Sequence, residues 1–188
     1  MARRKKKIIE GKIEKVNFPN MSEFTFEDKK VNFKGGIEGQ KVSVVVGRKR
    51  ANHMEAKLLE TLEKSELETN KTCPNYLECG GCSYQSVSHE YELNLKQRQI
   101  KELFEDIYSE EVEIFESPLK SAYRNKMEYT FADMYKDSPI MLGMHKKNRF
   151  YEVVDTKECN LVHRDFEVIR NAIVDFAREK ELQFVKKR

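Results

Sequence analysis

The four cysteines of this sequence, Cys73, Cys79, Cys82 and Cys159, are the residues whose type and spacing most clearly suggest chemistry. Three of them form a C-x5-C-x2-C pattern, and the fourth lies far downstream. Cysteine thiolates bind iron–sulfur clusters and structural zinc. Three thiolates from one loop and a fourth from a remote segment are close to the pattern of plant-type iron–sulfur proteins. We therefore expect all four side chains to bind one metal centre.

A pair of glycines, Gly80 and Gly81, separates the second cysteine from the third. Glycine lets the backbone wrap an inorganic core closely, and its N–H groups can donate hydrogen bonds to sulfur. Zinc sites usually show two separated cysteine pairs, so the three-plus-one distribution favours an iron–sulfur cluster, with zinc as the alternative. His163 is an alternative ligand, although we expect a surface position for it. A cluster with four thiolates has no open iron, which argues against direct catalysis by the metal.

Two basic regions carry side chains suited to an RNA backbone. One follows a predicted strand at residues 47–50, and the other combines residues 123–126 with residues 145–149. Both regions mix cations with aromatic or amide groups, as recognition of single-stranded RNA requires. A solvated turn is the competing interpretation for each region taken alone. The candidate RNA-binding residues are Arg48, Lys49, Arg50, Tyr123, Arg124, Asn125, Lys126, Lys146, Lys147 and Arg149.

Charge is unevenly distributed along the 188 residues, although the net charge is only +3. Residues 1–60 and 118–188 are net positive, which can attract phosphate, whereas residues 61–117 are net negative. The basic start is not followed by the apolar run of a signal peptide, and no segment approaches the ~20 apolar residues of a membrane span. We therefore expect a cytoplasmic protein that does not cross a membrane. Structural disulfides are rare in the cytoplasm, which is consistent with metal-binding cysteines.

The predicted elements form two domains after a disordered basic arm at residues 1–7. Short β-branched runs between glycine turns predict a small closed barrel over residues 8–63, in which residues 53–63 are a helix by propensity or a fifth strand. A polar linker at 64–72 precedes an α+β domain at 73–188. This domain should contain a helix at about 86–107, strands at 127–131, 140–144 and 150–154, and a final amphipathic helix at 166–177. The expected fold class is mainly β with α.

Two sequence runs resemble the RNA uracil-5-methyltransferase family. They are Cys-Gly-Gly-Cys-x-x-Gln at residues 79–85 and Tyr-Arg-Asn-Lys-Met-Glu at residues 123–128. The segments at 143–147 and 153–155 and the fourth cysteine also fit the family, so the resemblance covers essentially residues 8–182. It implies a five-stranded, OB-like TRAM barrel that binds RNA, with residues 53–61 as a strand. It also implies a central RNA-binding domain with a [4Fe-4S] cluster on Cys73, Cys79, Cys82 and Cys159.

The family's catalytic parts are missing from the expected elements. In the family, a cysteine thiolate adds to C6 of uracil, and S-adenosylmethionine then supplies the methyl group. If all four cysteines bind metal, no thiol remains as the nucleophile, and no glycine-rich turn between a strand and a helix suggests a cofactor pocket. Both elements lie C-terminal to this region in the family. The resemblance therefore implies that this chain is an N-terminal portion that is not catalytic alone. It also implies that S-adenosylmethionine binds only in the parent enzyme and not to this chain.

We expect this portion to recognise RNA, and we favour ribosomal RNA over transfer RNA as its substrate. The helix at about 86–107 should dock on the C-terminal methyltransferase domain of the parent protein, which leaves Leu103 and Phe104 partly exposed in this chain. The main alternative is a stand-alone RNA-binding module stabilised by zinc or by an iron–sulfur cluster. An electron-transfer protein is a further alternative.

Overall fold

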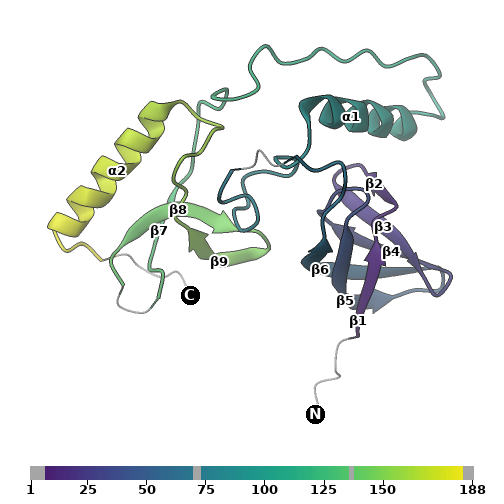
Figure 1. The fold of residues 1–188 in the computed structure, drawn as a ribbon, viewed down its shortest axis with the longest axis horizontal. Helices are drawn as coiled ribbons and strands as arrows, with labels where there is room; N and C mark the ends of the chain where they lie inside the picture. Colours follow the sequence, from purple (N-terminus) through teal and green to yellow (C-terminus); the bar gives the residue numbers. More distant parts are fainter. Residues whose placement is uncertain (1–6, 70–72, 136–137, 184–188) are drawn as a thin grey trace. The chain divides into compact units, whose positions relative to one another are not determined.

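The computed structural model describes residues 7–69, 73–135 and 138–183 (Figure 1). The chain is mainly β, and it forms two compact units. The first unit comprises Met1–Asn70 and Ser86–Glu116, and the second comprises Lys71–Gln85 and Ser117–Arg188. Except for Lys7, the predicted basic arm lies outside the described residues. In the described ranges, no helix is long and apolar enough to cross a lipid bilayer.

The first unit contains a six-stranded sheet in the order β1-β5-β6-β4-β3-β2. The edge strands β1 and β2 are separated by only two residues, Ile13 and Glu14, whose N–H groups donate to the carbonyls of Gln40 and Glu23 at 2.8 and 2.9 Å. The two edges are therefore joined, and the sheet closes on itself. The strands are β1 (Ile8–Lys12), β2 (Lys15–Asn17), β3 (Met21–Phe26), β4 (Lys29–Lys34), β5 (Lys41–Lys49) and β6 (His53–Glu63).

The first β-branched run of the barrel is thus bent into β1 and β2, so six strands are observed where the family resemblance implies five. The bend buries the Ile13 side chain in the core. Phe24 and Phe33 pack there edge to face, with ring centroids 5.8 Å apart. A Cβ at Gly11 would lie 2.3 Å from the Phe24 ring, so only glycine allows β1 to approach the ring this closely.

Residues 53–63 form strand β6, as the family resemblance implied, and the helix suggested by propensity is wrong. β6 pairs with β5 in an antiparallel ladder in which Val44 lies opposite Leu58 and Val46 lies opposite Ala56. This long-range pairing outweighs the local helix propensity of the segment. β5 also continues to Lys49, beyond the predicted end at Val46, so Arg48 and Lys49 belong to the strand and not to a turn after it.

Helix α1 (His89–Leu103) belongs to the first unit, whereas the sequence prediction placed residues 73–188 together. The Ser88 hydroxyl caps the helix by accepting a hydrogen bond from the Tyr91 N–H at 3.1 Å. The Gln99 side chain is buried and donates to the carbonyl of Val16 at 2.8 Å. Glu38 accepts hydrogen bonds from the Tyr91 hydroxyl at 2.9 Å and from Arg98. These contacts attach α1 to the closed sheet.

The second unit contains a three-stranded antiparallel sheet in the order β7-β8-β9 and one helix, α2. The predicted strand at 127–131 is observed only from Thr130, and the Met127 side chain instead lines a cavity described below. The elements of this unit are β7 (Thr130–Ala132), β8 (Met141–Lys146), β9 (Arg149–Val154) and α2 (Arg164–Glu179).

Helix α2 buries a different face from the one that its apolar pattern predicts. The buried residues are Arg170, Val174 and Ala177. The predicted apolar stripe consists of Phe166, Ile169, Ile173, Phe176 and Ala177. Of this stripe, Ile169 and Phe176 keep 59% and 57% of their surface accessible, whereas Ala177 is buried. An arginine therefore occupies the position nearest the sheet, and its hydrogen bonds compensate for its burial.

Candidate metal centre

The four cysteines line one cavity in the second unit. Cys73, Cys79 and Cys82 come from the loop before α1, and Cys159 comes from the segment between β9 and α2. All four are free thiols of intermediate exposure. As the side chains stand, the described residues contain no group of three or more His, Cys, Asp or Glu residues suited to a metal ion. The cavity thus brings four soft donors together without gathering them around one point.

Turns and one close backbone approach shape the cysteine loop. The Cys79 N–H donates to the Asn75 carbonyl at 2.7 Å, and the Gly81 N–H donates to the Cys79 Sγ at 3.4 Å. The latter is the type of N–H to sulfur bond predicted from the glycine pair. The Gly80 N–H donates to the carbonyl of His145 on β8 at 2.9 Å. A Cβ on Gly80 would lie 3.0 Å from that oxygen, so glycine lets the loop pack on the strand.

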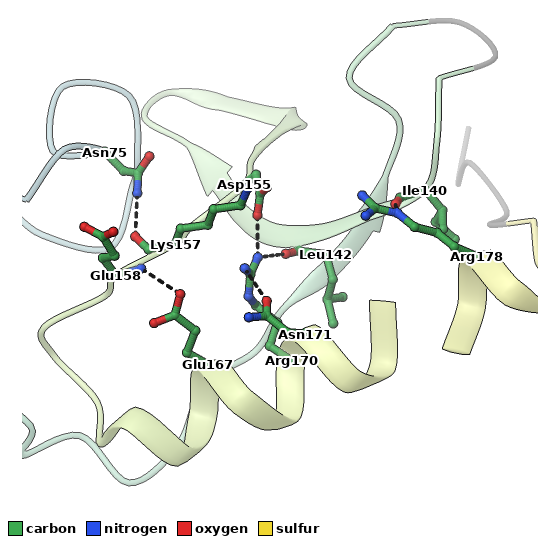
Figure 2. Close-up of polar contacts among 10 residues, drawn as sticks. All are labelled: Asn75, Ile140, Leu142, Asp155, Lys157, Glu158, Glu167, Arg170, Asn171 and Arg178. Atoms are coloured by element: carbon green, nitrogen blue, oxygen red, sulfur yellow. Dashed lines mark hydrogen bonds and ion pairs between the residues drawn. The ribbon is translucent and has the colours of Figure 1, made fainter. Parts of the chain in front are cut away.

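A polar network holds the segment that carries Cys159 (Figure 2). The Asn75 side-chain amide donates to the Lys157 carbonyl at 3.1 Å, which joins the cysteine loop to this segment. The Glu158 N–H donates to the Glu167 carboxylate on α2 at 3.3 Å. Both bonds engage the peptide group between Lys157 and Glu158, directly before Cys159. Neither Asn75 nor Glu167 has a characteristic spacing from a cysteine, so the sequence gives no signal for their roles.

Arg170 anchors the same segment from the buried face of α2. Its guanidinium donates to the Leu142 carbonyl at 2.7 Å and forms an ion pair with Asp155 (Figure 2). The Arg170 side chain is only 2% exposed, and the Asp155 side chain is 26% exposed. An arginine on the buried face of a helix needs such partners, and the apolar pattern of residues 166–177 gives no signal that Arg170 lies on that face.

Burial disfavours the ionised form of two of the thiols. It raises the pKa of Cys82 to about 11, with a further contribution from the neighbouring cysteines. Burial also raises the pKa of Cys79, although the hydrogen bond from Gly81 opposes this shift. Both thiols are therefore protonated at neutral pH in the metal-free protein. Metal binding has to displace their protons, because only the thiolate is a ligand.

Lys147, one of the candidate RNA-binding residues, packs against the cysteine loop. Its Nζ donates to the Tyr76 carbonyl at 2.7 Å and lies 3.9 Å from the centroid of the Tyr76 ring. Its backbone N–H donates to the Glu78 carbonyl at 2.7 Å. Burial lowers the pKa of Lys147, and Cys82 and Cys79 oppose that shift. The adjacent Lys146 instead forms ion pairs with the carboxylates of Glu78 at 2.8 Å and Glu152 at 3.7 Å.

The remaining RNA candidates divide between the two units. Arg48, Lys49 and Arg50 belong to the first unit, and the residues at 123–126 and 149 belong to the second. The Arg124 side chain lines the cysteine cavity, and its N–H donates to the Leu161 carbonyl at 2.9 Å. The other side chains of this set are exposed to solvent: Arg48, Lys49, Arg50, Tyr123, Asn125, Lys126 and Arg149.

His163 is the N-cap of α2, where its Nδ1 accepts a hydrogen bond from the Asp165 N–H at 3.4 Å. Its side chain is 67% exposed. This position agrees with the surface role expected for His163, and the residue does not line the cysteine cavity.

Nearly the whole chain is similar to part of several proteins named as RNA methyltransferases. It is 40% identical to an uncharacterized RNA methyltransferase of Clostridium acetobutylicum, over 97% of this chain and 41% of that protein. It is 38% identical to one of Clostridium tetani, with the same two coverages. A third, from Caldanaerobacter subterraneus subsp. tengcongensis, is 37% identical over 98% of this chain and 41% of its own length. The chain thus spans about two fifths of these curated relatives. No family model matches it.

A solved structure has the same fold. It is the crystal structure of the Pyrococcus abyssi tRNA (uracil-54, C5)-methyltransferase in complex with S-adenosyl-L-homocysteine. The TM-score is 0.58 and the sequence identity is 21%, over 92% of this chain and 37% of that one. Together with the curated relatives, this likeness supports the RNA methyltransferase family as the one to which the chain is related.

Proposed function

We propose that this chain is the RNA-recognition part of an S-adenosylmethionine-dependent RNA uracil-5-methyltransferase and carries a structural iron–sulfur cluster. The observation that carries the proposal is the convergence of Cys73, Cys79, Cys82 and Cys159 on one cavity. The relatives named as RNA methyltransferases and the fold shared with a tRNA uracil methyltransferase support this class of activity for the parent protein. In this proposal the first unit is a TRAM-type, OB-like barrel, and the chain is not catalytic alone.

The donor set fits a [4Fe-4S] cluster better than it fits zinc. Four thiolates at about 2.3 Å from one zinc ion would place their sulfur atoms about 3.8 Å apart. A four-iron core holds its thiolates further apart than a single zinc ion does, and here three cysteines of one loop and one remote cysteine line the same cavity. Bound to these thiolates, the cluster would supply a coordinate cross-link between the loop at 73–82 and the segment at 155–159.

Exposed cations of both units are the proposed contacts with RNA, and ribosomal RNA is the proposed substrate. Lys126 and Arg149 have side chains that are 78% and 64% exposed, and their partners Glu128 and Glu152 are exposed as well. Solvent screens exposed ion pairs, so they contribute little to stability and a phosphate group can replace either carboxylate. Arg48 and Lys49 lie at the exposed end of β5, where the strand presents their side chains to solvent.

The remaining part of the parent enzyme is the proposed partner of the C-terminal end of α1. Leu103 and Phe104 are 54% and 42% exposed, as predicted from the sequence, and Ile107 is 79% exposed. Covering these side chains would remove apolar surface from water. That part of the parent enzyme would also supply the S-adenosylmethionine site and the nucleophilic cysteine, because the four thiols here are assigned to the metal.

Anaerobic purification followed by absorbance spectroscopy and metal analysis tests the proposal. We expect brown protein with about four irons and four sulfides per chain, and Cys159→Ser should lose most of the iron. Salt-dependent binding of single-stranded ribosomal RNA without methyl transfer should accompany it. Colourless protein with one zinc would support the zinc-stabilised module instead, and the absence of any RNA binding would refute the recognition role.

A further inference from the structure

Lys147 brings a partly buried positive charge to the cysteine loop, although its place in a basic run indicates contact with RNA. Its ammonium donates to the Tyr76 carbonyl at 2.7 Å and covers the Tyr76 ring at 3.9 Å. Both partners belong to the stretch between Cys73 and Cys79. Neither the Tyr76 carbonyl nor the Tyr76 ring carries a formal charge. They accept the hydrogen bond and the cation–π contact of the ammonium, but they do not neutralise its charge.

In the part of the chain that the structure describes, the nearby carboxylate of Glu78 is paired with another cation. Glu78 accepts from Lys146 at 2.8 Å, and this ion pair accounts for the lowered pKa of Glu78. The groups that favour the charged form of Lys147 are Cys82 and Cys79. A partly buried ammonium that is held against the cysteine loop is complementary to the thiols only when they are ionised, which is their state when they bind metal.

From this geometry we propose that Lys147 is a positioning and charge-compensating residue of the metal centre and not an RNA contact. The inference rests on the proposed function, because it requires a metal on the four thiolates. Four thiolates around a [4Fe-4S]²⁺ core carry a net charge of −2, as do four thiolates around Zn²⁺. The ammonium would lower the cost of burying that charge, and its bond to Tyr76 would hold the loop in the ligating conformation.

Three substitutions separate the charge of Lys147 from its hydrogen bond. Lys147→Met keeps an unbranched side chain but removes both the charge and the donor. Lys147→Gln keeps a donor without the charge, and Lys147→Arg keeps the charge and a donor. Lys126→Met is the matched control, because it removes a lysine of the same unit whose side chain is 78% exposed and paired with Glu128.

The test uses the full chain, reconstituted anaerobically with iron and sulfide. The readouts are the iron and sulfide content, the rate of cluster loss to a chelator, and the midpoint potential of the one-electron couple, titrated with dithionite. We expect Lys147→Met and Lys147→Gln to have a more negative potential and at least roughly tenfold faster cluster loss. Lys147→Arg should stay near the parent potential, and Lys126→Met should match the parent chain in both respects.

Two outcomes would overturn the inference. The first is a parent chain that loads a cluster while Lys147→Met and Lys147→Gln keep its potential and its lifetime. The second is a Lys147→Met variant that holds a cluster with the same potential as the parent chain but binds RNA more weakly. This result would show that Lys147 contacts RNA. A parent chain that takes up no iron would refute the proposed cluster itself, which distinguishes the two failures. If circular dichroism shows that Lys147→Met does not fold, Lys147→Gln carries the comparison.

Discussion

The side-chain amide of Asn75 donates a hydrogen bond to the main-chain carbonyl of Lys157 at 3.1 Å. This single bond joins the loop that carries three cysteines to the segment that carries the fourth. The two residues are 82 positions apart in the sequence, so no local pattern could have indicated their contact. Because it links these two segments, the bond would help to hold the four thiols in one place.

Removing the Asn75 amide should loosen the metal centre without unfolding the chain. We expect Asn75→Ala to lose its cluster about fivefold faster than the parent chain, because one hydrogen bond contributes about 1 kcal/mol. Chelator competition followed by absorbance measures this rate. Asn125→Ala, which removes an exposed amide of the same unit, should leave it unchanged. Equal rates for all three proteins would show that the bond to Lys157 has no role in metal retention.

Replacing Arg170 should destabilise the second unit. Breaking a buried ion pair by removing one partner costs about 3–5 kcal/mol, and we expect Arg170→Met to fall near the lower limit because Asp155 is partly exposed. Arg178→Met is the control, since Arg178 is exposed and donates to a single carbonyl among the described residues, that of Ile140 at 2.9 Å. It should cost about 1 kcal/mol. Urea unfolding monitored by circular dichroism measures both, and similar free energies of unfolding would contradict the anchoring role of Arg170.

Metal loading should release protons and weaken as the pH falls. The pKa of Cys82 lies at about 11, above its ordinary value of 9.0, so this thiol is protonated below that pH and must lose its proton to bind. Each displaced proton lowers the apparent metal affinity about tenfold per pH unit of acidification. Zinc titrations by calorimetry, in buffers with different ionisation enthalpies, count the released protons. Cys82→Ala should release fewer, and an affinity independent of pH would exclude ligation by this thiol.

Removing one exposed cation at the end of β5 should weaken RNA binding and reduce its salt dependence. We expect Lys49→Ala to reduce the slope of log affinity against log salt by about 1, because one phosphate contact is lost. Fluorescence anisotropy with a labelled single-stranded ribosomal RNA oligonucleotide measures this slope. Lys41→Ala, at the opposite end of the same strand, is the control. Identical slopes for Lys49→Ala and the parent chain would show that Lys49 makes no contact with an RNA phosphate.

The sequence predicts the role of a residue where that role depends on its distance along the chain from other residues of the same type. The cysteine pattern indicated one site, and the glycine between Cys79 and Cys82 indicated a hydrogen bond to sulfur that is observed. The alternating valines of β5 indicated a strand with one buried face, and Val42 and Val44 are fully buried. Such local patterns report which face of an element is covered.

Other features depend on contacts between distant segments, and the sequence alone did not contain them. The apolar pattern of α2 predicts that Ile169 and Phe176 face the core. Arg170 is buried instead, because Asp155 and the Leu142 carbonyl accept the hydrogen bonds of its guanidinium. The basic run at residues 145–149 predicts that Lys147 contacts RNA. Its actual neighbour, Tyr76, is 71 positions away. Helix α1 joined the first unit through Gln99, whose buried hydrogen bond to Val16 has no sequence signature.

The chain passes between the two units three times, because Ser86–Glu116 belongs with the first unit while the segments on either side of it belong to the second. The second unit is therefore discontinuous along the gene, with Cys82 and Cys159 encoded on opposite sides of α1. A cut anywhere between them would divide the ligands of one site between two polypeptides. An evolutionary rearrangement could thus exchange both units together far more easily than it could exchange either one by itself.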